Sequence, residues 1–299
     1  MRRSICFPII CTIALLFSFM LHVNTAKSDD TIDKADIWEE VVEDIDDAPG
    51  YEDPEDRIRN WAVRVGVIGG VSPDYEGSDD YEFGMGPFIS ITWKDFVWFK
   101  GKSLGMNLLK RGAWVAGPQV AKSSGRDEDD NNKLEGLDDV DGGFEVGGFV
   151  KYRKKPFRLE LDIRQDTGSG HEGALIEAGA GVGIPFDKPL FLAMLHTTWA
   201  SDDYMEDFFG VSANESARSG LKEFDADSGI KDIGIKLTSG IRLRKNLRIA
   251  LSLQYKRLIG DASDSPIVDD ENQFLAGVGI VYSWGSKKLQ RKLRKEEEM

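Results

Sequence analysis

The feature of this chain that most constrains its fold is an alternation of apolar and polar residues, repeated in short runs between residues 61 and 284. In LRIALSLQYK (residues 247–256), leucine, isoleucine and tyrosine occupy every second position. In FRLELDIR (residues 157–164), charged residues occupy every second position. Successive side chains of a β-strand point to opposite faces. Each run therefore predicts a strand with one apolar and one polar face.

Clusters of glycine, proline, aspartate and asparagine separate these runs, which is typical of an all-β domain. About twelve strands are expected, with about ten as the alternative count. The predicted ranges are 61–72, 82–93, 96–100, 103–109, 113–121, 142–152, 157–165, 173–184, 190–200, 230–241, 247–258 and 273–284. The division of 96–109 at Gly101 and Lys102 matters, because one unbroken strand there would exchange the sides of all later loops.

The connections between the predicted strands alternate between two kinds. Every second connection is short and mostly basic, namely Lys94-Asp95, LKRG, RKKP, PFDK and RLRKN. The others, apart from Gly101-Lys102, are long and mostly acidic, namely SPDYEGSDDY, AKSSGRDEDDNNKLEGLDDVD, residues 201–229 and IGDASDSPIVDDEN. Short periplasmic turns and long extracellular loops are the asymmetry of outer-membrane β-barrels. An even number of strands also brings both ends of the barrel to the periplasmic side.

Alternation alone does not say which face is outside, since a soluble lipocalin-like barrel has the same period. Two features favour the membrane. The polar face of residues 157–164 is ionic, which suits a polar lumen. Aromatic girdles mark the two lipid–water interfaces of membrane barrels, and five tryptophans fall near predicted strand ends: Trp61, Trp93, Trp114, Trp199 and Trp284. We therefore predict a transmembrane antiparallel β-barrel over residues 59–285.

The N-terminal segment differs in composition from the barrel. Residues 1–26 predict a signal peptide, since two arginines precede an apolar core and Asn24-Thr25-Ala26 offers a cleavage site. An uncleaved anchor is the alternative, because the apolar run of residues 5–23 is long. Both cysteines lie in this segment, and no later apolar run has the length of a transmembrane helix.

Two further segments flank the predicted barrel. Residues 27–58 predict an acidic periplasmic extension, in which Ile37, Val41 and Ile45 recur at helical spacing. This extension suits either a solvated tail or a short helix that docks on a partner. Residues 286–299 predict a charged C-terminal tail, interpreted as a frayed terminus or as a basic arm for anionic partners.

Charge and composition exclude some classes of site. A net charge of −14 disfavours nucleic acid as a partner. A zinc site is disfavoured, because the chain beyond residue 26 has two histidines and no cysteine. The acids of SPDYEGSDDY lack the spacing of a calcium-binding EF-hand loop, so we expect a hydrated hairpin there rather than a calcium site. No catalytic, cofactor-binding or metal-binding residue is predicted.

The histidines and the longest loops give further expectations. RDEDDNN (residues 126–132) is expected to be solvated, and His171 to be exposed in the glycine-rich DTGSGHEGA. An outer-membrane phospholipase needs a Ser–His pair on its lipid-facing wall, but His196 shares a strand face with Thr198 and should point into the lumen. We therefore predict a non-enzymatic protein. The aromatics of FFGV (residues 208–211) should fold back onto the barrel rim, with a surface recognition patch as the alternative.

Several stretches resemble the MipA/OmpV family of Gram-negative outer-membrane proteins. They are SPDYEGSDDYEFGMGPFI, SLGMNL, FFGVSANESARSGLKEFDADSGIKDIGI, YKRLIGDASDSPIV and NQFLAGVGIVYSW, in this order along the chain. The resemblance implies an outer-membrane barrel that acts as a scaffold for enzymes that synthesise and hydrolyse murein, and it implies no catalytic residue. The long acidic lead-in and the residues after Trp284 depart from the family pattern.

The resulting expectation is a scaffold in the cell outer membrane that serves cell-envelope maintenance. Its expected partners are outer-membrane lipid, periplasmic murein synthases and lytic transglycosylases, with no cofactor and no nucleic acid. The alternative is a small-solute pore or uptake channel. In that case the lumen would be narrowed by the polar-face side chains Arg158, Glu160, Arg248 and Lys256.

Overall fold

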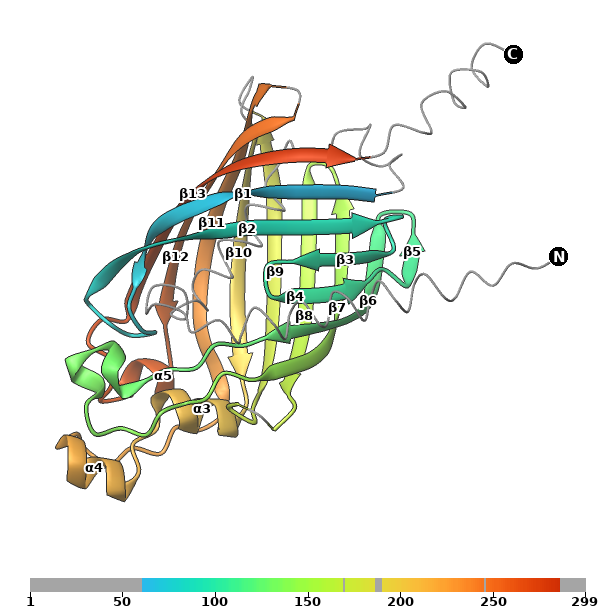
Figure 1. Ribbon diagram of the computed structural model, residues 1–299. Coiled ribbons are helices and arrows are strands. Elements are labelled where there is room, and N and C mark those ends of the chain that lie inside the picture. Colours follow the sequence, from blue (N-terminus) through green and yellow to red (C-terminus); the bar gives the residue numbers. More distant parts are fainter. Residues whose placement is uncertain (1–60, 169, 186–189, 245, 286–299) are drawn as a thin grey trace, which may run out of the picture.

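The computed structural model describes residues 61–168, 170–185, 190–244 and 246–285 of the chain. The predicted signal peptide, acidic extension and C-terminal tail lie outside these residues. Within them, strands dominate, and all of the strands belong to one antiparallel sheet (Figure 1). The strands are β1 (Trp61–Pro73), β2 (Tyr81–Trp93), β3 (Val97–Lys100), β4 (Ser103–Met106), β5 (Leu109–Arg111), β6 (Trp114–Lys122), β7 (Phe144–Lys154), β8 (Phe157–Asp166), β9 (Ala174–Pro185), β10 (Leu190–Ala200), β11 (Gly229–Arg244), β12 (Leu247–Leu258) and β13 (Asn272–Gly285).

The sheet closes into a barrel. From β6 to β13 each strand pairs with its neighbours in the sequence, and β13 pairs with β1, bringing Ala62 opposite Gly285. The chain therefore enters and leaves the barrel at the same end, as the even strand count predicts. The circle is completed where Leu104 and Gly105 of β4 pair with Val120 and Gln119 of β6.

One predicted strand is wrong in detail. The range 103–109 is not continuous, because the chain turns after Met106 and resumes in β5. The backbone N–H of Asn107 donates to the carbonyl of Phe96 (2.7 Å), and its side chain donates to the carbonyl of Asp95 (3.1 Å), which holds this turn. Because β4 and β5 both pair with β6, the two segments occupy one position of the wall, and the barrel has twelve strand positions.

The two faces of the wall differ in chemistry as the alternation predicts. In β8, Leu159 and Ile163 are exposed on the outside, whereas Arg158 faces inward and is buried. In β12, Leu253 is 55% exposed, whereas the neighbouring Gln254 is 4% exposed. An apolar outer surface around a polar lumen is the reverse of a soluble barrel and is the arrangement that a lipid environment requires.

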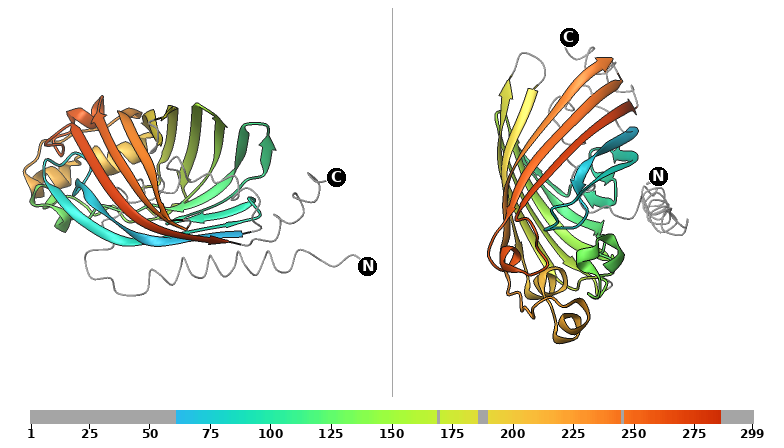
Figure 2. Two further views of the ribbon diagram at one scale, coloured as in Figure 1. Left: turned by 90° about the horizontal axis from the view of Figure 1, so that it is seen from above. Right: turned by 90° about the vertical axis from the view of Figure 1, so that its left-hand side faces the viewer.

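The two ends of the barrel differ in the length of their connections. One end, the turn end, has short connections such as residues 112–113 and 155–156. The other, the loop end, carries long loops, and Figure 1 and Figure 2 show that the helical segments gather there. These segments are η2 (Glu128–Asp130), η3 (Asn132–Leu134), α3 (Asp202–Phe209), α4 (Ala213–Ser219) and α5 (Asp261–Asp264). No helix in the described ranges is long and apolar enough to span a membrane.

The loops close the loop end with small apolar cores. Phe209 is completely buried, and it packs with Tyr204, Met205 and Leu258. A second core joins Tyr75 and Ile267 to Leu134 and Val211 of the two longest loops. The expectation that the aromatics of residues 208–211 fold back onto the rim is therefore confirmed. Helix α4 begins at a capping box, in which Ser212 accepts from Glu215 N–H (3.3 Å) and the Glu215 carboxylate accepts from Ser212 N–H (2.8 Å).

Candidate functional site

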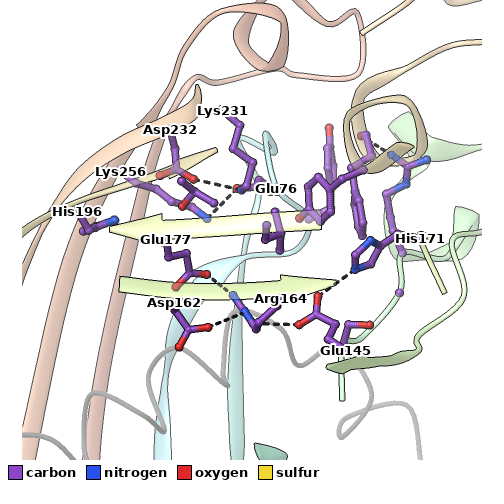
Figure 3. Close-up of a pocket in the computed structure, with 18 of the residues that line it drawn as sticks. Glu76, Glu145, Asp162, Arg164, His171, Glu177, His196, Lys231, Asp232 and Lys256 are labelled. Carbon is purple, nitrogen blue, oxygen red and sulfur yellow. Dashed lines mark hydrogen bonds and ion pairs between the residues drawn. The ribbon is translucent and has the colours of Figure 1, made fainter. Parts of the chain in front are cut away.

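The lumen beneath the closed loops contains a polar cavity of about 200 Å³ (Figure 3). Its roof includes Tyr75, Arg126, Tyr204 and Phe208, and its walls are inward-facing side chains of the strands. A second cavity of about 100 Å³ shares four of these residues and continues the lumen toward the turn end. The shared residues are Asp162, Glu177, His196 and Thr198.

One group of wall residues, the arginine cluster, is formed by Glu145, Asp162, Arg164 and Glu177. Arg164 lies 3.2 Å from Glu145 Oε2 and 3.4 Å from Asp162 Oδ1, and it also donates to Glu177 Oε1. Asp162 and Glu177 stand directly opposite each other on β8 and β9. Like charges at such positions repel, so the guanidinium between them is what allows this pairing.

His171 joins the arginine cluster from the loop after β8. Its Nε2 lies 3.0 Å from Glu145 Oε1, and its Nδ1 accepts a hydrogen bond from Gly173 N–H (3.2 Å). Because Nδ1 is an acceptor, the proton of the neutral ring is on Nε2 and is donated to the carboxylate. The ring is 1% exposed and meets Tyr204 edge-on at 4.9 Å. The prediction that His171 is exposed is therefore wrong, because glycine-rich neighbours gave no sign of the carboxylate beneath.

The second group, the lysine cluster, is formed by Glu76, Lys231, Asp232 and Lys256. Glu76 Oε1 accepts from Lys231 Nζ (2.6 Å) and from Lys256 Nζ (2.8 Å), and Lys231 also lies 3.1 Å from Asp232 Oδ2. The register of β10 and β11 shifts here, with Thr198 opposite Asp232 and Trp199 opposite Ile230. Lys231 is the extra residue of this bulge, which explains why two successive side chains, Lys231 and Asp232, are both buried.

Glu76 reaches this cluster from SPDYEGSDDY, the loop between β1 and β2. Burial alone would raise the pKa of Glu76, but Lys231 and Lys256 outweigh it and hold the pKa at about 2. The prediction of a hydrated hairpin is thus confirmed for Asp79 and Asp80, which are exposed, and wrong for Glu76. A charge run in a sequence does not reveal which of its members turns inward.

The rest of that loop is fastened to the loop between β12 and β13. Tyr75 Oη donates to the carbonyl of Ile267 (3.0 Å), and the Gly77 carbonyl accepts from the N–H groups of Asp269 and Asp270 (2.8 and 3.0 Å). Gly77 has φ +108°, and a Cβ there would lie 2.6 Å from Val268. Only glycine suits both the backbone conformation and the close approach.

Arg126 corrects a further expectation. Residues 127–129 of RDEDDNN are exposed as predicted, but Arg126 is 5% exposed and its Nη1 donates to the carbonyl of Phe208 (2.7 Å). Burial lowers the pKa of this guanidinium. The bond joins the loop after β6 to the loop after β10 across the roof of the cavity.

His196 points into the lumen, as its strand face predicts. Its Nε2 lies 3.3 Å from the side-chain nitrogen of Gln254 on β12. His196 lines both cavities. Within the described ranges, no group of three or more His, Cys, Asp or Glu side chains could hold a metal ion. The side chains that line the two cavities are mostly charged or hydrogen-bonding groups.

The turn end carries a different surface, the basic rim. Its connections are exposed and rich in basic residues. Among the described residues of these turns, Asp95 is the only acidic one. Lys110 is ion-paired with Asp95. The basic rim consists of Lys94, Lys110, Arg111, Arg153, Lys154, Lys155, Arg242 and Arg244.

Closed antiparallel strands, an apolar outer wall, a polar lumen and long loops at one end define an outer-membrane β-barrel protein. The turn end is then periplasmic and the loop end extracellular. Comparison with known proteins identifies the family. The protein-family model described as "MltA-interacting protein MipA" matches residues 65–284, and the chain belongs to this family.

Individual relatives are named MltA-interacting protein or OmpV. Over 86 residues the chain is 30% identical to the MltA-interacting protein of Escherichia coli strain K12, a match that covers 29% of this chain and 34% of the relative's length. It is 26% identical over 240 residues to the outer membrane protein OmpV of Vibrio cholerae, covering 74% of this chain and 86% of OmpV. Among solved structures, the translocator domain of the autotransporter NalP from Neisseria meningitidis is similar with a TM-score of 0.43 at 10% identity, covering 86% of this chain and 99% of that domain.

Proposed function

We propose that this protein is a non-enzymatic scaffold whose periplasmic face binds murein-synthesising and murein-hydrolysing enzymes. The observation that carries the proposal is the division of its surfaces. The loops pack closed over the extracellular end, whereas the periplasmic end presents the exposed basic rim. The name of the E. coli relative refers to an interaction with MltA, which makes a murein lytic transglycosylase the first partner to test.

The basic rim supports a partner with an acidic surface. Charged patches of opposite sign steer two proteins together and fix their orientation, and this contribution weakens as salt screens it. Arg111, Lys154 and Arg244 are exposed and come from three different turns. A partner that touches all three would span the periplasmic opening of the barrel.

Reversing these three charges is expected to weaken binding. The triple variant Arg111→Glu, Lys154→Glu, Arg244→Glu should bind purified MltA about tenfold more weakly than the wild-type barrel, mainly through a slower association rate. Biolayer interferometry with the detergent-solubilised barrel measures this at two salt concentrations. Chains without residues 27–58 or 286–299, measured alongside, report whether these segments contribute.

The matched control is Lys222→Glu, an exposed charge on the extracellular side. It should leave the association rate unchanged. Absence of MltA binding to the wild-type barrel would contradict the proposed partner, and equal binding by the triple variant would remove the basic rim as the docking surface.

A small-solute pore is the second candidate function. The observation in its favour is that two polar cavities adjoin along the lumen. The closed loops and the buried ion pairs oppose it, because a solute would have to displace them to pass. Planar-bilayer recordings separate the two functions: discrete open-channel currents favour the pore, and a silent bilayer favours the scaffold.

A further inference from the structure

Four inward-facing side chains lie in one row across four neighbouring strands. Asp162 of β8 pairs with Glu177 of β9, Glu177 with Thr198 of β10, and Thr198 with Asp232 of β11. Adjacent strands are about 4.8 Å apart. Three carboxylates and one hydroxyl therefore follow one another at a spacing that a single small molecule can bridge.

The cavity around this row carries an excess of negative charge. Seven acidic and four basic side chains line it, which leaves a formal excess of three negative charges with neutral histidines. Lys231 and Lys256 together balance Glu76 and Asp232. Arg164 neutralises only one of the three acids of the arginine cluster, so most of the excess lies there, at Asp162 and Glu177. Negative charge on a buried carboxylate such as Asp232 is costly unless a cation compensates it.

A second, independent observation points to a ligand at the end of this row. Asp232 is 2% exposed, and in the described part of the chain its Oδ1 has no hydrogen-bond partner. Its other oxygen, Oδ2, is the one near Lys231. A buried carboxylate oxygen without a donor loses the hydration it had in water, and this oxygen belongs to a residue that lines the cavity.

We propose that the cavity binds a small primary amine, with its ammonium group held by Glu177, Thr198 and Asp232. An ammonium group has three N–H donors. Asp232 supplies Oδ1, Thr198 supplies its hydroxyl oxygen, and Glu177, which meets Arg164 through Oε1, supplies Oε2. The ligand approaches from the periplasm, because the second cavity continues from this row toward Arg158 and Lys236 while the loops close the other end. This site is independent of the proposed scaffold function.

The test uses putrescine (1,4-diaminobutane) and the detergent-solubilised full chain. Isothermal titration at low ionic strength should show saturable binding to one site. Asp232→Asn and the isosteric Thr198→Val should each weaken the affinity about tenfold or more, since the first removes the negative charge that pairs with the ammonium group and the second removes the hydroxyl acceptor. Methylammonium should compete with putrescine, whereas tetramethylammonium, which has no N–H group, should not.

The matched control is Asp79→Asn, which removes a charge from an exposed position of the extracellular loop. It should leave the affinity unchanged. Heat-dependent gel mobility verifies that each variant is folded. If Asp232→Asn does not fold, Thr198→Val alone tests the site. The proposal is overturned if the folded wild-type chain shows no saturable binding, if Asp79→Asn weakens binding as much as the cavity variants do, or if tetramethylammonium competes as well as methylammonium.

Discussion

Replacing Glu76 by glutamine is expected to lower the free energy of unfolding of the barrel by about 3 kcal/mol, because it leaves buried cations without their counter-charge. Glu76 is the shared acceptor of Lys231 and Lys256, at 2.6 and 2.8 Å. Its side chain is 14% exposed and that of Lys231 is 6% exposed, so water compensates little of the loss. A urea titration of the detergent-solubilised protein, followed by tryptophan fluorescence, measures the change.

The pH dependence gives this prediction a second measurement. The pKa of Glu76 is lowered from 4.5 to about 2 in the folded barrel. A carboxylate with a lowered pKa stabilises the fold fully above its unfolded value and loses this contribution as the pH falls through the folded value. The difference between wild type and Glu76→Gln should therefore be constant above about pH 5 and shrink as the pH falls toward about 2.

The double variant Glu76→Gln, Lys256→Met supplies the control. Removing one of the two stranded cations should recover part of the lost stability, because the methionine keeps most of the side-chain volume. A loss well below 1 kcal/mol in Glu76→Gln, or no recovery in the double variant, would show that the lysine cluster does not hold this loop.

The wall of the barrel was predictable because its pattern repeats locally. The alternation in residues 157–164 and 247–256 needs only the sequence, and it placed Arg158 and Gln254 in the lumen and Leu159 and Leu253 outside. The lengths of the connections likewise separated the two ends. The break after Met106 was missed, because the turn depends on hydrogen bonds from Asn107 to residues of the preceding turn rather than on a glycine or proline.

The cavity could not be predicted in the same way, because it depends on registers between strands. The alternation already placed Asp162 on the inner face, but only the pairing with β9 brings Glu177 opposite it. The inward position of both Lys231 and Asp232 depends on a bulge, which breaks the alternation itself. Glu76 and His171 lie in loops, where no period indicates direction. The sequence indicated the cavity only through the charged residues on the lumen face of the strands, because buried charges need partners of opposite sign.

The contrast between the two faces leads to the second large effect. Leu253→Arg is expected to destabilise the barrel in phospholipid vesicles by about 2–4 kcal/mol, because it places a charge at the centre of the lipid-facing wall. Leu253 lies in the middle of β12 and is 55% exposed. Leu243→Arg is the matched control: Leu243 is 52% exposed, but it lies near the turn end of β11 between two arginines. The same substitution near the interface costs about 0–1 kcal/mol. Unfolding titrations in vesicles compare the two variants, and equal losses would contradict the depths in the bilayer assigned to Leu253 and Leu243.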